Sequence, residues 1–366
     1  MTLADPLRVV LAGAGNMGRA WRATIEAAPD VELAGIADID RAAAEAAAAE
    51  LGRPVEVGTD AVALAAATGA RAVVDVTVPA AHHPVTTAAL FAGLDVLGEK
   101  PVAETVAQAL SLAAASEVTG RLFMVSQSRR WNPQLFALRA MAEDLGALGS
   151  LTTEFFRAPR FGGFREEMAH PLLVDMAIHA FDSARFVLGT EPVSAYCETH
   201  NPSWSWYAGD AAATVVFAFE GGARYTYTGS WCSPGEQTSW NGVWRLSAEK
   251  GSAHWDGDHD PAIDADVELT PRPPGLFSGI EGSLLVFTDA LRTGVPPMGE
   301  VHENVLSLAM VEAAVRSAET GQRVLLDDVL AEARAEALRT ESNPDVRDAL
   351  ASWPNVREVL TAATRP

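Results

Sequence analysis

A short apolar run, Arg8-Val9-Val10-Leu11-Ala12, leads directly into Gly13-Ala14-Gly15-Asn16-Met17-Gly18, and a helical pattern follows. In such a loop the first glycine allows a tight turn, the second lets backbone approach a pyrophosphate, and the third lets a helix pack closely on a strand. The N-terminus of the following helix favours phosphate, because its unpaired N–H groups and its dipole attract anions. The stretch therefore predicts the first strand, loop and helix of a dinucleotide-binding fold.

A carboxylate follows the second predicted strand. Asp38 stands twenty residues after Gly18, directly behind the apolar run at residues 31–37. A carboxylate at this position binds the 2′-hydroxyl of an adenosine ribose and repels a 2′-phosphate. Arg41, the nearest cation, falls in the first turn of the next predicted helix. We therefore expect NAD in preference to NADP, bound by the residues Gly13, Gly15, Asn16, Met17, Gly18 and Asp38.

The rest of the pattern divides into two domains and a tail. Up to residue 126, short apolar runs alternate with helical segments, which is typical of a parallel sheet with crossover helices. Beyond residue 131, two helices are predicted at residues 133–145 and 171–188, and several strands then follow one another without intervening helices. We expect an α/β dinucleotide-binding domain over residues 1–126, an α+β domain with an antiparallel sheet over 127–330, and a helical tail over 331–366.

Composition limits the classes of partner. The 366-residue chain carries 27 Lys and Arg against 48 Asp and Glu, a net charge of −21. Such a negative charge repels the phosphates of nucleic acids and anionic lipids. We therefore expect a small-molecule partner, and we expect neither nucleic-acid binding nor membrane binding. The two cysteines, Cys197 and Cys232, lack metal-ligand spacing and are too few for a disulfide framework. With no basic leader and no long apolar run, the sequence predicts a cytoplasmic protein without a metal site.

Lysine use is informative because the chain has only two lysines, Lys100 and Lys250. Lys100 lies in Gly98-Glu99-Lys100-Pro101, at the carboxyl end of a predicted parallel strand, where open α/β sheets bind their ligands. An ammonium group is a compact hydrogen-bond donor to an alkoxide, and its pKa shifts readily on burial. Lys250 falls in a predicted turn. We interpret Lys100 as a catalytic candidate, with Glu99 either orienting Lys100 or contacting the cofactor.

The predicted helix at residues 171–188 carries Asp175, His179 and Asp182, whose spacings of four and three residues put them on one helix face. A histidine one turn from a carboxylate can be held in one orientation and can carry a proton near neutral pH. Taken alone, such a pair is more often structural. Combined with Lys100 and the glycine motif, it favours Asp175 and His179 as catalytic residues.

Aromatic and basic side chains of the second domain are candidates for a substrate site. Flat rings suit the faces of a sugar or cyclic polyol, although they can equally cover a sheet face or a subunit interface. Trp204 and Trp206 are the better substrate candidates because they fall in a predicted loop. Arg157 belongs to a basic cluster at residues 157–165, which either binds an acidic substrate or edges the cleft, and we favour the second role. His170 precedes the predicted helix and is also a substrate candidate.

The glycine motif, Glu99-Lys100-Pro101 and Asp175-x-x-x-His179 occur in the order and spacing of the Gfo/Idh/MocA oxidoreductase family, which the sequence resembles over about residues 7–326. The Glu-Lys-Pro segment and the Asp-His pair are far more specific than the glycine motif. The resemblance implies a Rossmann domain, a second domain with an open, mostly antiparallel sheet, hydride transfer to nicotinamide, and a homodimer or homotetramer built through the sheets. It also implies that Lys100, Asp175 and His179 are the catalytic set.

The segment at residues 73–79 resembles the strand end that lines the cofactor in this family. The resemblance implies cofactor contacts for Thr77 and Pro79 and for one of the two histidines that follow, His82 or His83, of which we favour His82. Glu99 and Lys100 complete the expected cofactor set.

Together these features predict an NAD-dependent dehydrogenase that removes hydride from a secondary alcohol of a sugar, anhydrosugar, glycoside or inositol-like polyol. His179 would take the hydroxyl proton, and Lys100 would stabilise the developing alkoxide. Two other classes stay open. An NAD-dependent glycosidase using transient sugar oxidation would release an aglycone without net NADH, and a non-catalytic NAD-binding regulator on the same fold would form no NADH with any polyol.

Overall fold

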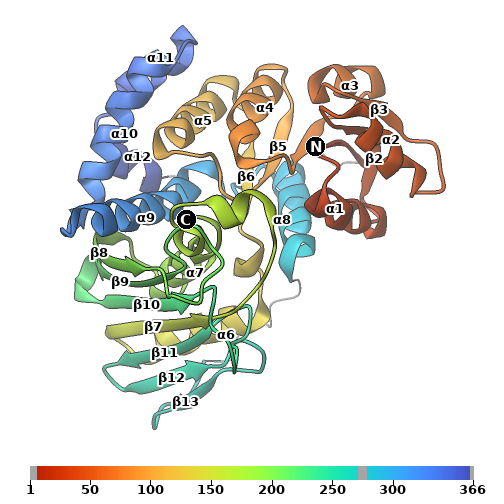
Figure 1. Ribbon diagram of the computed structural model, residues 1–366. Coiled ribbons are helices and arrows are strands. Elements are labelled where there is room, and N and C mark those ends of the chain that lie inside the picture. Colours follow the sequence, from red (N-terminus) through yellow and green to blue (C-terminus); the bar gives the residue numbers. More distant parts are fainter. Residues whose placement is uncertain (1–5, 271–277, 363–366) are drawn as a thin grey trace. The chain divides into compact units, whose positions relative to one another are not determined.

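The computed structural model describes residues 6–270 and 278–362. The chain forms two compact units, whose elements are drawn in Figure 1. The first unit contains Met1–Ser128, Ile280–Val305 and Leu330–Pro366, and the second contains Arg129–Gly279 and Leu306–Val329. This division differs from the sequence-based one, which kept residues 280–305 with the second domain and residues 331–366 as a separate tail. Helical periodicity reveals an apolar face but not the unit against which that face packs.

The first unit is built on a six-stranded parallel sheet in the order β3-β2-β1-β4-β5-β6. Because this order changes direction at β1 and β4, it is the Rossmann arrangement, in which ligands bind beyond the carboxyl ends of the strands. The strands are β1 (Leu7–Ala12), β2 (Val31–Ala37), β3 (Glu56–Gly58), β4 (Ala72–Asp75), β5 (Asp95–Glu99) and β6 (Phe123–Ser126). The predicted α/β class of this domain is confirmed.

Helices connect these strands: α1 (Asn16–Ala27), α2 (Arg41–Ala49), α3 (Ala61–Thr68), α4 (Pro79–Phe91) and α5 (Val106–Thr119). Side-chain caps fix three of the starts, since Asp40, Asp60 and Thr105 each accept a backbone N–H of the first turn. The apolar run at residues 72–78, the third one expected to form a parallel strand, ends as a strand at Asp75. Pro79 already occupies the first turn of α4, a position that suits its fixed backbone angle.

The C-terminal part of the chain is helical, as expected. Its helices are α8 (Gly279–Thr293), α9 (Val301–Thr320), α10 (Leu326–Thr340), α11 (Pro344–Ser352) and α12 (Val356–Ala362). Within the first unit α11 packs on α5, and Ser111 of α5 donates a hydrogen bond to Glu341. The segment before α9 runs beside β6, where the Val125 N–H donates to the carbonyl oxygen of Gly299 over 2.8 Å.

The second unit is built on an eight-stranded sheet in the order β13-β12-β11-β7-β10-β9-β8-β14. The β7 and β10 pair is parallel, whereas the other neighbouring strands described are antiparallel, so the mostly antiparallel sheet is confirmed. The strands are β7 (Leu148–Phe156), β8 (Pro192–His200), β9 (Ala212–Phe219), β10 (Arg224–Ser230), β11 (Val243–Ala248), β12 (Gly251–Trp255), β13 (Ala262–Asp264) and β14 (Val324–Leu325). Helices α6 (Pro133–Asp144) and α7 (Ile178–Leu188) contact the sheet at β12 and β7 respectively.

The predicted helix at residues 171–188 consists of two elements, and its polar face is not continuous. A π-helix, η3 (Leu172–Ala177), precedes α7, and its wider turn changes the angular spacing between Asp175 and His179. His179 and Asp182 both lie in α7, three residues apart, which keeps them on neighbouring positions of one helix face. Asp182 also forms a buried ion pair with Arg130 at 2.6 Å, a contact that the sequence did not predict.

Candidate functional site

The glycine loop between β1 and α1 has the shape that a dinucleotide requires. Gly13 has a φ of +108°, and a Cβ there would lie 2.7 Å from the carbonyl oxygen of Val76. A Cβ on Gly18 would collide with the carbonyl oxygen of Gly13, so this glycine lets helix and strand pack closely. A Cβ on Gly15 would meet no atom within 4 Å. The space in front of Gly15 is thus open on the side where a pyrophosphate approaches, and the loop fits NAD.

Asp38 is fixed against this loop. Its Oδ2 accepts the N–H of Ala14 over 2.8 Å, and its Oδ1 accepts the N–H of Asp40 over 2.9 Å. Arg41, the nearest cation along the sequence, donates from Nε to Glu45 at 2.9 Å, one turn further along α2. A carboxylate held beside the loop, with the neighbouring guanidinium already engaged, suits an unphosphorylated ribose.

The end of β4 is organised by the buried carboxylate of Asp75. Its Oδ1 accepts from the backbone N–H and the hydroxyl of Thr77, at 3.1 and 2.6 Å, and its Oδ2 accepts from the hydroxyl of Thr86 at 3.1 Å. Burial raises the pKa of Asp75, although the nearby His82 and these hydrogen bonds oppose the rise. Thr77, a predicted cofactor residue, is thereby held in place directly before Pro79 begins α4.

His82, the other predicted cofactor residue of this segment, lies between two strand ends. Its Nδ1 is 2.7 Å from the carbonyl oxygen of Pro101, and its Nε2 is 3.1 Å from the carbonyl oxygen of Thr77. The side chain is buried. These two contacts therefore link the segments that follow β4 and β5. An effect of His82 on cofactor binding would act through the backbone of Thr77 and Pro101.

Glu99 and Lys100 occupy the carboxyl end of β5, as predicted. The buried Glu99 accepts from the indole nitrogen of Trp21 at 2.9 Å and from the backbone N–H of Lys100 at 3.2 Å. Burial raises the pKa of Glu99, while these two hydrogen bonds and the charge of Lys100 oppose the rise. The Lys100–Pro101 peptide bond is cis. Of the two roles open to Glu99, these contacts favour orienting Lys100.

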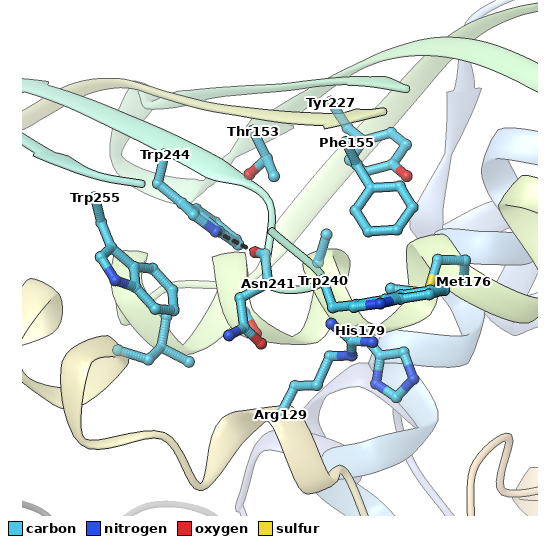
Figure 2. Close-up of a pocket in the computed structure, with 13 residues that line it drawn as sticks. Arg129, Thr153, Phe155, Met176, His179, Tyr227, Trp240, Asn241, Trp244 and Trp255 are labelled. Carbon is cyan, nitrogen blue, oxygen red and sulfur yellow. Dashed lines mark hydrogen bonds between the residues drawn. The ribbon is translucent and has the colours of Figure 1, made fainter. Parts of the chain in front are cut away.

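In the second unit, His179 lines a pocket between the helices and the sheet, shown in Figure 2. Met176 and Ala180 form its helical side together with His179, and residues from the strands and from the loop before β11 form the rest. The side chains facing the pocket combine aromatic rings with hydrogen-bonding groups, and include Arg129, Thr153, Tyr227, Trp240, Asn241 and Trp244. The space that they enclose is about 10 Å³, which is room for about one water molecule.

Asp175, predicted to act with His179, lies in η3 and forms an ion pair with Arg165. The Nε of Arg165 donates to Oδ2 of Asp175 at 2.7 Å, and the carboxylate is 16% exposed against 34% for the guanidinium. Asp175 is therefore oriented by a charged partner from the loop at residues 157–168. His179 and Asp175 belong to the second unit, and Lys100 belongs to the first.

The two tryptophans predicted to contact substrate lie in the loop between β8 and β9. Trp204 is 62% exposed, and its indole nitrogen donates to the carbonyl oxygen of Cys232 at 2.9 Å. The guanidinium of Arg160 stacks on the ring of Trp206, and its Cζ is 3.9 Å from the ring centroid. Neither tryptophan is among the described residues that line the His179 pocket.

Arg157 and His170, the other predicted substrate residues, also lie outside the wall of that pocket as far as the structure describes it. Arg157 donates from Nη1 to the carbonyl oxygen of Thr238 at 2.7 Å and stacks on Trp240, one of the pocket's rings. The Nδ1 of His170 is 4.0 Å from a carboxylate oxygen of Asp210.

Sequence reasoning missed Arg129 and Tyr227, which do line the pocket. A signal for Arg129 was present, since Arg129 and Arg130 lie three and four residues after the end of the last parallel strand. Tyr227 gave a weaker signal, because it alternates with polar residues in β10 like any inward-facing residue of a strand.

Two family models match the chain, one over each unit's core. Residues 7–127 match the oxidoreductase family with an NAD-binding Rossmann fold, and residues 139–254 match the GFO/IDH/MocA C-terminal domain. The glycine loop and the Rossmann sheet thus define an NAD-binding oxidoreductase. The chain belongs to the GFO/IDH/MocA family, as its sequence motifs predicted.

Similar proteins cover most of the chain. An uncharacterised protein, y4oX, of Sinorhizobium fredii is 30% identical, over 90% of this chain and 98% of the relative. The D-apiose dehydrogenase of Paraburkholderia graminis is 28% identical, over 73% of this chain and 75% of the relative. Among solved structures, an oxidoreductase from Agrobacterium radiobacter in complex with NAD+, L-tartaric acid and magnesium superimposes with a TM-score of 0.80 at 21% identity, covering 88% of this chain and 99% of that one.

Among the helices of the described residues, none combines the length and the apolar character needed to cross a bilayer.

Proposed function

We propose that the protein is an NAD-dependent dehydrogenase that removes hydride from a secondary alcohol of a sugar or cyclic polyol. The observation that carries the proposal is the glycine loop between β1 and α1, where the open space beside Gly15 fits a pyrophosphate. The same chain has Lys100 directly after β5 and His179 at the start of α7, the two groups that the proposal assigns to the reaction. Relatives point the same way, since they include the D-apiose dehydrogenase and an inositol 2-dehydrogenase of Rhizobium meliloti that is 34% identical over 51% of this chain.

The chain's own residues hold the cofactor and handle the proton. Gly13, Gly15 and Gly18 shape the loop for the pyrophosphate, and Asp38 receives the ribose hydroxyls. Bound NAD supplies the hydride acceptor. Beyond Asp38, Thr77 is the residue of the β4 end best placed for a cofactor contact, since Asp75 fixes both its backbone and its hydroxyl.

His179 accepts the proton of the substrate hydroxyl as the carbon loses hydride, a general-base step that an imidazole performs well near neutral pH. Lys100 donates a hydrogen bond to the same oxygen and stabilises the negative charge that develops there. Glu99 holds the backbone of Lys100, and Arg165 holds Asp175 in η3 beside His179. These two supports keep the reacting groups oriented, which is where much of the rate enhancement in such a site arises.

The two lysines provide a matched test. A panel of aldoses, inositols, anhydrosugars and glycosides is assayed with NAD and NADP by nicotinamide absorbance, and Lys100→Met is compared with Lys250→Met. Lys250 is a suitable control because the hydrogen bond that its ammonium makes among the described residues runs to the carbonyl oxygen of Asp144, at 3.3 Å. We expect Lys100→Met to lower kcat by about 100-fold or more with NAD binding nearly intact, and Lys250→Met to behave as wild type.

The same panel separates the competing functions. Equal activity of Lys100→Met and wild type would remove the proposed mechanism. Release of an aglycone without net NADH would identify a glycosidase, and NAD binding with no turnover of any compound would identify a regulator.

A further inference from the structure

A larger cavity lies in the second unit, at the end of α7 that is remote from His179. Its volume is about 340 Å³, against about 10 Å³ for the cavity beside His179. This volume is within the range of small-molecule binding pockets. Its wall comes from three places, which are the end of α6 with the start of β7, the end of α7, and the turn between β9 and β10.

The larger cavity is separate from the one beside His179. Among the described residues, none lines both cavities. On α7, His179 lines the small cavity and Leu188 lines the large one, and the nine residues between these positions span about 14 Å of helix. On α6 the corresponding residues are Leu135 and Ala142. A molecule in the larger cavity therefore does not touch His179.

Much of the wall of the larger cavity is apolar. It includes Ala142, Leu148, Val187, Leu188 and Ala223. All of these except Leu148 are buried, so their side chains form the floor of the cavity. Because burial of apolar area supplies free energy of binding, such a floor favours a ligand with a compact apolar body.

Hydrogen-bond acceptors dominate the polar part of the wall. The carboxylates of Glu143 and Glu220 belong to it, and both α6 and α7 end there. The last carbonyl groups of a helix have no partner within the helix and carry partial negative charge. The guanidinium described in the wall, that of Arg139, donates from Nε to Glu143 at 3.1 Å and stacks on the ring of Phe186, whose centroid is 4.6 Å from its Cζ. The positive charge of Arg139 is therefore already paired within the protein.

Two further charges lie close to the wall where α6 ends. The Oε2 of Glu249 accepts the N–H of Ala147 at 3.4 Å, and the ammonium of Lys250 donates to the carbonyl oxygen of Asp144 at 3.3 Å. Their charges have opposite signs and offset each other. The two carboxylates and two helix ends of the wall thus keep a surplus of negative charge over the one guanidinium.

We propose that the larger cavity binds a small organic cation, namely a primary ammonium group on a compact apolar body such as a ring. The ammonium donates to Glu220 and to the carbonyl groups at the helix ends, and the apolar body packs on Val187, Leu188 and Ala223. A neutral alcohol of the same shape lacks the charge attraction, and a carboxylate is repelled. The proposal is independent of the proposed function, since the described wall contains none of the residues assigned to cofactor binding or hydride transfer.

The first experiment compares three compounds of similar shape and different charge. Phenethylammonium, 2-phenylethanol and phenylacetate are each titrated into the wild-type protein without NAD, by calorimetry at low salt, where charge interactions are least screened. We expect phenethylammonium to bind with a Kd of about 1 mM or lower and about tenfold more tightly than the alcohol, and we expect no saturable binding of phenylacetate. Equal or tighter binding of the alcohol or the acid would overturn the choice of a cation. Absence of saturable binding by all three would overturn the site itself.

Amide hydrogen exchange locates the bound amine. With phenethylammonium present, we expect slower exchange in peptides that cover residues 142–148, 187–190 and 220–223, which contribute to the wall, and unchanged exchange at the glycine loop of residues 13–18. Protection at the glycine loop, or protection that omits all three segments, would show that the amine binds elsewhere and would contradict the proposal.

Variants test the position of the ammonium. Glu220→Gln removes one negative charge at an exposed residue of the wall, so the protein should fold, and we expect the affinity for phenethylammonium to fall about tenfold with no change for 2-phenylethanol. Glu154→Gln is the matched control, because Glu154 is also exposed but is not among the described residues of the wall. Ala147→Phe adds volume at another exposed residue of the wall and should weaken binding of both compounds. Equal effects of Glu220→Gln and Glu154→Gln would show that only the overall charge of the protein matters, which would overturn the proposed contact.

Discussion

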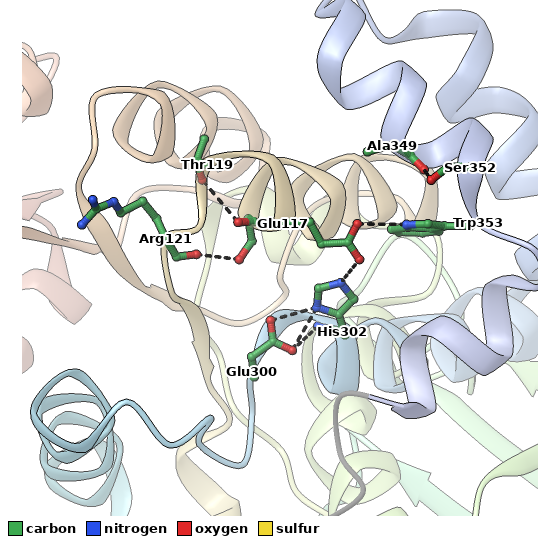
Figure 3. A network of polar contacts seen from close by, with 9 residues as sticks. Glu117, Thr119, Arg121, Glu300, His302, Ala349, Ser352 and Trp353 are labelled. Carbon is green, nitrogen blue, oxygen red and sulfur yellow. Dashed lines mark hydrogen bonds and ion pairs between the residues drawn. The ribbon is translucent and has the colours of Figure 1, made fainter.

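The indole nitrogen of Trp353 donates a hydrogen bond of 3.0 Å to Oε2 of Glu117, a residue of α5 that precedes it by 236 positions. The other carboxylate oxygen of Glu117 is 2.9 Å from Nε2 of His302, whose Nδ1 lies 2.9 Å from Glu300. Figure 3 shows this chain of contacts, with the imidazole between the two carboxylates. One histidine at the start of α9 therefore ties α5 to the C-terminal helices within the first unit.

The contact of His302 with Glu117 and Glu300 predicts a loss of folding stability at alkaline pH. Burial alone would lower the pKa of His302, but the hydrogen bonds and charges of Glu117 and Glu300 outweigh it and raise the pKa to about 9. Because the folded-state pKa lies above the unfolded value of 6.5, the stabilisation is complete below about pH 6.5 and is lost as pH rises through 9. The difference corresponds to roughly 3 kcal/mol in the free energy of unfolding.

The measurement is the melting temperature of wild type and of His302→Gln between pH 6 and 10. We expect wild type to be the more stable at pH 6 and the two proteins to converge toward pH 10. Parallel curves across this range would contradict the assignment of a charged imidazole to this contact.

The glycine loop offers a prediction that separates binding from folding. A Cβ on Gly15 meets no protein atom within 4 Å, whereas a Cβ on Gly18 would collide with the backbone of Gly13. Gly15→Ala should therefore melt like wild type but bind NAD at least about tenfold more weakly, because the methyl group enters the space of the pyrophosphate. Gly18→Ala should lower the melting temperature even without NAD. Comparable NAD affinity of Gly15→Ala and wild type, measured by titration calorimetry, would argue that the dinucleotide does not bind against this loop.

The carboxylate of Asp38 predicts the choice of dinucleotide. Asp38→Asn keeps an oxygen that can accept the Ala14 N–H but removes the charge that repels a 2′-phosphate. We expect the ratio of NAD affinity to NADP affinity to fall by about tenfold, with little change in melting temperature. Glu45→Gln is a second variant for comparison, because it weakens the ion pair of Arg41 and leaves the glycine loop unchanged. An unchanged affinity ratio in Asp38→Asn would mean that another group selects the cofactor.

The sequence was most informative where local rules decide the structure. The apolar run before Gly13 and the glycine spacing predict strand, loop and helix because each glycine meets a steric requirement of that turn. The strand at residues 31–37 was located to the residue, since a fully buried parallel strand reads as a continuous apolar run. The position of Lys100 at a strand end followed from the same pattern.

Contacts between distant residues were the part that the sequence could not provide. The spacing of Asp175, His179 and Asp182 indicated one helix face, but the π-turn and the ion pairs with Arg165 and Arg130 separate the roles of the three side chains. The pocket wall likewise depends on how the loop before β11 folds back, which no local pattern specifies. For this reason the loop tryptophans were favoured over the residues that face His179.

The ion pair of Arg130 and Asp182 leads to the last prediction, which distinguishes a structural carboxylate from His179, the proposed general base one turn away. Arg130 donates from Nε and Nη2 to the two oxygens of Asp182 at 2.9 and 2.6 Å, and Ser307 donates to the same carboxylate at 2.8 Å. Both side chains of the pair are 1% exposed. Asp182→Asn leaves a buried guanidinium without its counter-charge and should cost about 3–5 kcal/mol in the free energy of unfolding.

His179→Asn should behave in the opposite way, losing turnover while its melting temperature stays closer to that of wild type, because its imidazole lines a cavity that the smaller amide side chain can occupy. The double variant Arg130→Met/Asp182→Leu should recover much of the stability lost in Asp182→Asn, since it removes both charges and keeps apolar volume. Urea unfolding followed by tryptophan fluorescence measures all three. A wild-type unfolding midpoint for Asp182→Asn would show that the ion pair contributes little, and Asp182 would then have to be reconsidered as a partner of His179.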